Sequence, residues 1–183
     1  MSHDILIVDD ELDIRSLLSG ILQDEGYDTR QAANSNQAIA AINLRLPTLI
    51  ILDIWLQNSD LDGLKILEWI QKSYPGCPVI MISGHGNIQT AVSAIKSGAY
   101  DFIEKPFKAD KLILLVKRAI EAAGLKRENK ELKEQVGPRE NLIGESPEIG
   151  NLLNSIEKVA PSNSRVLITG PAGSGKEIVA RML

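Results

Sequence analysis

Three aspartates stand directly after short apolar runs of the chain. Asp9 and Asp10 follow Asp4–Val8, and Asp53 follows Leu49–Leu52. Unpaired carboxylates that lie close together repel one another and raise one another's pKa. A hard divalent cation such as Mg²⁺ relieves this repulsion, because it takes one or two carboxylates and keeps waters on its other positions. A carboxylate beside that cation can attack a phosphoryl donor and form an aspartyl phosphate. The three aspartates therefore predict a Mg²⁺-dependent phosphoryl-transfer site.

Two further polar side chains follow later apolar runs. Ser83 comes after Val79–Ile82, and Lys105 comes after Asp101–Ile103 and before Pro106. A lysine neutralises the charge that a transferred phosphoryl group retains, and a hydroxyl group hydrogen-bonds it. Both residue types suit the site that the aspartates predict.

Each of these residues also has a simpler interpretation. The aspartates could cap a helix or end a strand, and Ser83 and His85 could be turn residues of the stretch Ser-Gly-His-Gly. Lys105 and Pro106 could serve backbone geometry alone. The occurrence of all five polar residues at one edge of a sheet is a much less expected coincidence, so we favour the site.

The first 120 residues alternate between short β-branched runs and segments of helical period. The expected strands are Asp4–Val8, Tyr27–Ala32, Leu49–Leu52, Val79–Ile82 and Asp101–Ile103. The expected helices are Glu11–Asp24, Ser35–Leu44, Leu64–Ser73, Ile88–Ser97 and Ala109–Ala123. Strands that are apolar on both faces indicate a parallel sheet covered by helices on each side. Five such units predict an α/β fold, a doubly wound five-stranded parallel sheet of order 2-1-3-4-5, with ligands at the carboxyl ends of its strands.

The pattern changes after Ala123. The stretch 124–136 is rich in Lys and Glu, and Leu125 and Leu132 are seven residues apart. This indicates an exposed linker helix, which could form at most a short coiled coil. Gly137-Pro138 is expected to end it. Arg165–Thr169 is a further candidate for a buried strand.

A glycine-rich segment follows that candidate strand and precedes a helical segment. Gly170, Gly173 and Gly175 lead into Lys176 and Glu177. In this context a P-loop cradles nucleotide phosphates with backbone N–H groups, and its lysine reaches the terminal phosphates. The usual final Ser or Thr is Glu177 here, so a glycine-rich turn without a ligand is the alternative.

Composition excludes several classes of protein. The chain of 183 residues is 44% hydrophobic and 24% charged, which is typical of a globular protein. No apolar run is long enough to span a bilayer, and a single cysteine, Cys77, fits a reducing cytoplasm. The net charge is −5 for residues 1–123 and +1 for residues 124–183, so neither part suggests a nucleic-acid surface.

Four stretches resemble the receiver domains of two-component response regulators: ILIVDDE (5–11), LIILDIWL (49–56), VIMISGHG (79–86) and SGAYDFIEKPF (97–107). The resemblance implies a flavodoxin-like fold and phosphorylation of Asp53. It also implies Mg²⁺ binding by Asp10 and Asp53, with Asp9 assisting, and by the backbone carbonyl of Trp55. Further roles are implied at three other positions: Ser83 as the switch hydroxyl, Lys105 as the phosphate-pairing base with a cis bond to Pro106, and Phe102 as the switch aromatic. The implied output is dimerisation through residues 84–123.

One loop departs from the receiver pattern. Receivers usually have a Pro soon after the acceptor and Asp-Gly about eight residues on. Here Gln57 replaces the Pro, and Gly63 comes two residues late. The loop after Asp53 is therefore longer and more polar than in other receivers. The receiver pattern does not predict how this loop affects access to the phosphoryl group or the lifetime of the phosphorylated state.

The order of segments resembles the NtrC-type activators of sigma-54 RNA polymerase, which carry Glu at this P-loop position. The long loop resembles the NtrX branch, whose partner is the membrane kinase NtrY in nitrogen-related signalling. The resemblance implies a receiver domain (1–120), a helical linker (121–137) and the start of an AAA+ ATPase domain that binds ATP (138–183). Contacts to DNA and to the polymerase are expected outside these residues. The 183 residues alone are not expected to hydrolyse ATP, and whether the whole protein does so is left open.

Two other functions fit the same residues. The chain could be a stand-alone phosphorelay or adaptor receiver that dimerises through its C-terminal helix. It could also be a P-loop NTPase whose α/β N-terminal domain has an unrelated role.

Overall fold

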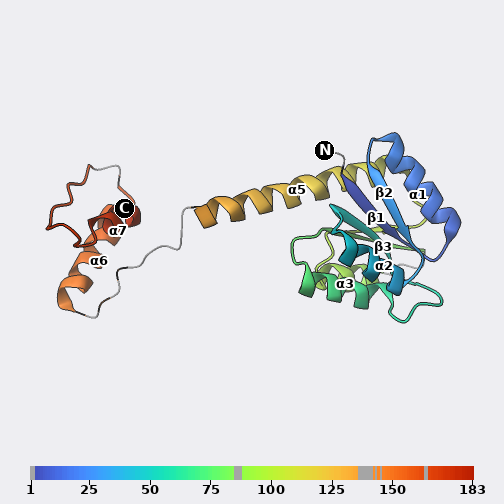
Figure 1. Ribbon diagram of the computed structural model, residues 1–183, viewed down its shortest axis with the longest axis horizontal. Helices are drawn as coiled ribbons and strands as arrows, with labels where there is room; N and C mark the ends of the chain where they lie inside the picture. Colours follow the sequence, from blue (N-terminus) through green and yellow to red (C-terminus); the bar gives the residue numbers. More distant parts are fainter. Residues whose placement is uncertain (1–2, 85–87, 136–141, 143, 145, 163–164) are drawn as a thin grey trace. The chain divides into compact units, whose positions relative to one another are not determined.

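The computed structural model describes residues 3–84, 88–135, 142, 144, 146–162 and 165–183. The chain divides into two compact units, Met1–Glu128 and Asn129–Leu183 (Figure 1). His85 and the predicted helix stop at Gly137-Pro138 lie outside the described residues.

The first unit contains a five-stranded parallel sheet of order β2-β1-β3-β4-β5. Its strands are β1 (Asp4–Val8), β2 (Asp28–Ala32), β3 (Leu49–Asp53), β4 (Val79–Ser83) and β5 (Asp101–Glu104). Every neighbouring pair is parallel. The predicted sheet and its order are confirmed, and each strand lies within two residues of its predicted bounds.

Helices cover both faces of the sheet. The helices that cover the sheet are α1 (Leu12–Asp24), α2 (Ser35–Leu44), α3 (Gly63–Ser73), α4 (Ile88–Lys96) and α5 (Ala109–Gln135), and α5 continues past the end of this unit at Glu128. Buried residues of α1 and α5 pack with Ile5, Ile7 and Ile51 on one face, whereas α2, α3 and α4 pack with Leu6, Ile50 and Leu52 on the other. Alternate residues of one strand thus enter opposite cores, which is why β1 and β3 are apolar along both faces.

Helix α5 does not stop where its apolar pattern stops. Its first half buries Leu112, Val116 and Ala119, whereas Leu125 and Leu132 in its second half are exposed. The sequence pattern indicated two segments, but a single helix runs from Ala109 to Gln135. Lys, Glu and Leu are strong helix formers, so the backbone continues after the buried face ends.

The second unit contains α6 (Pro147–Val159) and α7 (Lys176–Met182). The Ser146 hydroxyl accepts a hydrogen bond from the Ile149 N–H and caps α6. The strand predicted at Arg165–Thr169 is wrong for this structure, because these residues are neither in a strand nor buried, and Leu167 is 88% exposed. An apolar run becomes a buried strand only when other strands satisfy its backbone groups, and the described residues of this unit provide none. No helix among the described residues is long and apolar enough to cross a membrane.

Candidate functional site

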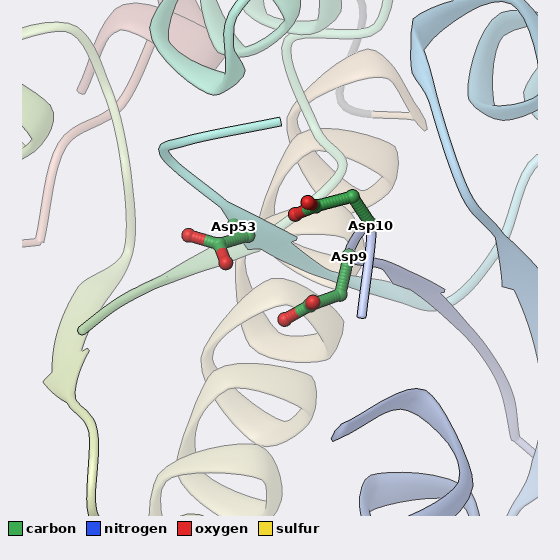
Figure 2. A group of neighbouring side chains, drawn as sticks. All are labelled: Asp9, Asp10 and Asp53. Carbon is green, nitrogen blue, oxygen red and sulfur yellow. The ribbon is translucent and has the colours of Figure 1, made fainter. Parts of the chain in front are cut away.

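Three carboxylates converge at the carboxyl edge of the sheet. Asp9 and Asp10 follow β1, and Asp53 ends β3, the strand beside it. Figure 2 shows the three side chains around a common space, and one carboxylate oxygen from each lies within 4.8 Å of the others. Asp9 and Asp53 are buried, whereas Asp10 is half-buried. The sequence predicted this convergence from strand order alone.

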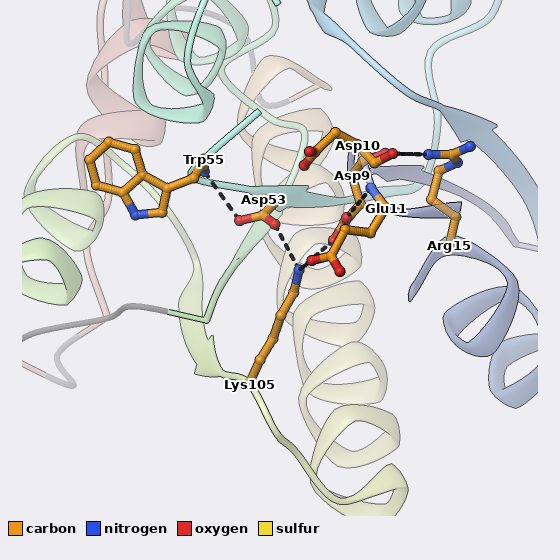
Figure 3. A network of polar contacts seen from close by, with 7 residues as sticks. All are labelled: Asp9, Asp10, Glu11, Arg15, Asp53, Trp55 and Lys105. Atoms are coloured by element: carbon orange, nitrogen blue, oxygen red, sulfur yellow. Dashed lines mark hydrogen bonds and ion pairs between the residues drawn. The ribbon is translucent and has the colours of Figure 1, made fainter. Parts of the chain in front are cut away.

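Lys105 neutralises part of this charge. Its Nζ atom donates hydrogen bonds to Asp9 Oδ2 at 2.8 Å and to Asp53 Oδ2 at 2.7 Å, and it lies 3.5 Å from Glu11 Oε1 (Figure 3). The Lys105 N–H donates to the Ser83 carbonyl at 2.8 Å, which holds the end of β5 against β4. The Lys105-Pro106 peptide is cis, as the receiver resemblance implied. One ammonium group thus links the two buried carboxylates.

The electrostatic balance still favours a cation. Burial is the main cause that raises the pKa of Asp9 above 3.8, and it outweighs the hydrogen bonds from Lys105 and from the Glu11 N–H, which lower it. Burial would lower the pKa of Lys105, but hydrogen bonds to Asp53 and Asp9 outweigh burial and raise it. Lys105 is therefore held as a cation, and the site would be stabilised by a further positive charge.

The donor set fits Mg²⁺. All three side chains offer hard oxygen ligands. Asp9 accepts hydrogen bonds on both oxygens, from Glu11 and Lys105. Within the described part of the chain, no protein donor is bonded to the Asp10 carboxylate. Asp10 can thus turn to a cation without breaking a protein contact.

Asp53 is buried and accepts a hydrogen bond from the backbone. Asp53 is 4% exposed, and its Oδ1 accepts a hydrogen bond from the Trp55 N–H at 3.2 Å. The Trp55 side chain is 58% exposed. The Gly63 N–H donates to the Ile54 carbonyl at 2.9 Å, so the first turn of α3 lies against the backbone that follows Asp53. Ligation of a metal by the Trp55 carbonyl stays a prediction.

The long loop after Asp53 is fastened to the start of α2. The Ser35 N–H donates to the Ser59 hydroxyl at 2.9 Å, and the Ser59 hydroxyl donates to the Leu61 carbonyl at 2.8 Å. The Asn36 amide donates to Asp60 Oδ2 at 2.9 Å. Sequence reasoning identified the extra residues of the loop but not this attachment, because no local pattern connects residues 24 positions apart.

The two predicted switch residues lie in neighbouring strands. Ser83 is the last residue of β4 and is fully buried, and its register partner in β5 is Glu104. Phe102 is half-buried and packs against the core on the α2, α3 and α4 face. Their positions suit the predicted switch hydroxyl and switch aromatic, and the roles themselves stay predictions.

The glycine-rich segment of the second unit forms a loop before α7. Gly173 and Gly175 both have φ of 77°, a conformation that favours glycine. The Lys176 Nζ donates to the carbonyls of Gly170 at 3.0 Å and Pro171 at 2.6 Å, within its own loop. Glu177 pairs with Arg181 one helical turn later. Nucleotide binding by these residues stays a prediction.

Arg15 was not identified from the sequence. From α1 its Nη1 donates to the carbonyl of Asp9 at 2.7 Å and to the carbonyl of Asp10 at 3.0 Å (Figure 3). The signal that could have indicated it is its position, because a cation in the first turns of a helix is unfavourable to the helix dipole and needs another reason.

A doubly wound sheet with an acidic triad at its carboxyl edge and a lysine that bridges two of the carboxylates is the arrangement expected of a receiver domain. The comparison with protein families agrees, because the response regulator receiver domain matches residues 5–117, and the chain belongs to this family. The sigma-54 interaction domain matches residues 143–183.

Among curated proteins, the chain is similar to the nitrogen assimilation regulatory protein NtrX of Azorhizobium caulinodans. The two are 56% identical over 183 residues, which are 100% of this chain and 40% of that protein. The chain thus spans about 40% of the length of this relative.

Two crystal structures of NtrX from Brucella abortus are also similar. One matches with a TM-score of 0.75 and the other, in complex with ATP, with a TM-score of 0.73. Both are 59% identical and cover 100% of this chain and 40% of the solved chain.

Proposed function

We propose that this chain is the phosphorylation-controlled front part of an NtrX-like transcription regulator and that Asp53 accepts the phosphoryl group. The observation that carries the proposal is the placement of Asp53 beside Asp9, Asp10 and Lys105 at the switch point of the sheet. Ligands of doubly wound sheets bind at this place. The 56% identity to an NtrX protein supports the regulatory role.

In phosphoryl transfer the protein mainly positions the reacting groups and stabilises the charge on the phosphoryl oxygens. An oxygen of the Asp53 carboxylate attacks the phosphorus of a phosphohistidine, the P–N bond breaks, and the imidazole nitrogen leaves with its electron pair and takes up a proton from water. Mg²⁺ held by Asp9, Asp10, Asp53 and the Trp55 carbonyl would neutralise charge on the phosphoryl oxygens.

After transfer, two side chains of the chain would stabilise the product. The Lys105 ammonium, which now contacts Asp53 Oδ2 at 2.7 Å, moves onto a phosphoryl oxygen. The Ser83 hydroxyl forms a hydrogen bond to another. This movement of Ser83 frees the space into which the Phe102 ring turns. The resulting change in residues 84–123 alters a homodimer interface.

The partners follow from the same assignment. The phosphodonor is a sensor histidine kinase of the NtrY kind, and the setting is nitrogen-related signalling in the cytoplasm. Gly170, Gly173, Gly175, Lys176 and Glu177 would bind ATP when the AAA+ domain is complete. Contacts to DNA and to sigma-54 RNA polymerase belong to parts of the protein outside this chain. The Brucella abortus NtrX complex with ATP supports the nucleotide assignment.

Labelling with a small phosphodonor tests the acceptor. The chain should gain one phosphoryl group with acetyl phosphate and Mg²⁺, measured by intact mass, and chelation should prevent this. Asp53→Ala should abolish labelling, whereas Lys176→Ala should retain it, because Lys176 belongs to the other unit. Unchanged labelling of Asp53→Ala would exclude the proposed acceptor.

Association tests the proposed output. Sedimentation velocity with and without beryllofluoride, a phosphoryl mimic, should show a change in the dimer population. The same population in both states would contradict the role of residues 84–123.

A further inference from the structure

Arg15 contacts the acidic site through backbone rather than through its carboxylates. One nitrogen, Nη1, donates to the carbonyls of both Asp9 and Asp10. These two residues form the turn between β1 and α1, so a single side chain fixes the direction in which both carboxylates leave the backbone. Arg15 is half-buried.

Asp9 and Asp10 depend on this contact to different degrees. The Asp9 carboxylate is also held directly, by the Glu11 N–H at 2.9 Å and by Lys105 at 2.8 Å. The Asp10 carboxylate has no protein donor within the described part of the chain. Its position is therefore set by the backbone, and Arg15 is the side chain that holds the carbonyl of that backbone.

The location of Arg15 is otherwise unfavourable. It lies in the first turns of α1, where the helix dipole disfavours a cation. Its positive charge also lies beside a site that binds a cation. Two charge-assisted hydrogen bonds to main-chain carbonyls compensate for this placement.

We propose that Arg15 is a positioning residue for the metal site, which it serves by holding Asp10 in place for Mg²⁺. The inference rests on the proposed function, since it assumes that the acidic triad binds Mg²⁺. Residues that orient metal ligands typically change metal affinity by about 10- to 100-fold when they are removed. We expect the lower end of that range, because Asp9 and Asp53 keep their own contacts.

The sign of the effect separates positioning from simple charge. If Arg15 acted only through its charge, Arg15→Met would strengthen Mg²⁺ binding, because a repelling cation is removed. Positioning predicts the opposite, a dissociation constant about tenfold higher. Arg15→Lys keeps the charge but not the planar guanidinium group, so it should also weaken binding, by a smaller factor.

The experiment is a Mg²⁺ titration of the 183-residue chain, followed by the backbone amide chemical shifts of Asp10 and Trp55. Arg165→Met is the matched control, because Arg165 is exposed, lies in the other unit, and its removal changes the net charge equally. Urea unfolding of each variant reports stability separately. Weaker Mg²⁺ binding by Arg15→Met, with Arg165→Met unchanged, would support the inference.

Two other outcomes would overturn it. Equal or tighter Mg²⁺ binding by Arg15→Met would remove the role of Arg15 alone and leave the proposed function intact. Absence of Mg²⁺ binding by the unchanged chain would contradict the metal site of the proposed function and the role of Arg15 with it.

Discussion

Gly63→Ala is the substitution for which the structure predicts the largest steric effect. A Cβ atom at Gly63 would overlap the Asp53 carbonyl oxygen and would lie 2.8 Å from Ile54 Cα and 2.9 Å from the Asp53 carbonyl carbon. All three are backbone atoms, so no change of side-chain rotamer can relieve the contact. The start of α3 must therefore move away from the end of β3.

The magnitude follows from three contributions. Overpacking destabilises a protein by about 1–3 kcal/mol, and loss of the hydrogen bond from Gly63 N–H to Ile54 adds about 1 kcal/mol. The preference for Ala over Gly in a helix returns about 0.5–1 kcal/mol. We therefore expect Gly63→Ala to lower the free energy of unfolding by about 1–3.5 kcal/mol.

Gly20→Ala is the matched control with the opposite sign. Gly20 lies inside α1, and a Cβ atom there would meet nothing within 4 Å. The same chemical change should raise the free energy of unfolding by about 0.5–1 kcal/mol.

Urea unfolding followed by tryptophan fluorescence measures both variants. Both tryptophans, Trp55 and Trp69, lie in the first unit, so the signal reports on that unit. With a slope of about 1.5 kcal/mol per M, the midpoint should fall by about 0.7–2.3 M for Gly63→Ala. It should rise by about 0.5 M for Gly20→Ala. A midpoint for Gly63→Ala that is unchanged or raised would refute the steric reasoning.

Three further changes test the site and its support. Because burial raises the folded pKa of Asp9 above 3.8, Asp9 stabilises the fold while it is protonated. That stability is lost as the pH rises from this value through the folded pKa. In urea unfolding without Mg²⁺, Asp9→Asn should therefore gain stability relative to the unchanged chain as the pH rises above 3.8. A difference that does not change with pH would contradict this. Lys105→Met should lower the free energy of unfolding by about 3 kcal/mol in chelator, because it leaves Asp9 and Asp53 without their cation. Saturating Mg²⁺ should reduce this loss of stability of Lys105→Met. An equal loss with chelator and with Mg²⁺ would contradict the reasoning. Asn34→Ala removes the cap on the Gln37 N–H of α2 and should cost about 1 kcal/mol in the same assay, with Asn34→Asp as the variant that retains the cap.

The sheet could be predicted from the sequence because each strand has its own local pattern of apolar residues and the five patterns support one another. Five apolar runs separated by helical segments permit few arrangements, and the carboxyl ends of parallel strands must lie at one edge. Asp9, Asp53 and Lys105 could therefore be brought together without knowledge of any contact. Their observed separations agree with that expectation.

Other features could not be predicted, for separate physical reasons. The strand expected at Arg165–Thr169 needed partners that only a tertiary structure can supply. The continuity of α5 with the linker helix was not predicted, because the change in polarity after Ala123 is not a change in helix propensity. The contacts of Arg15 with the site could not be predicted, and neither could the attachment of Ser59 to Ser35. Both consist of hydrogen bonds to backbone groups, which the pattern of apolar residues does not indicate.

The position of β3 has a consequence for the motions that Asp53 can make. This strand is the middle one of five, is paired on both sides and is buried along its whole length. Amide hydrogens of such a strand exchange with solvent only when much of the sheet opens, so we expect Leu52 and Asp53 to belong to the slowest-exchanging part of the unit. The backbone of Asp53 is thus held in place by the sheet. In the proposed function the phosphodonor must therefore approach Asp53, and any response must begin in the side chains and loops around it.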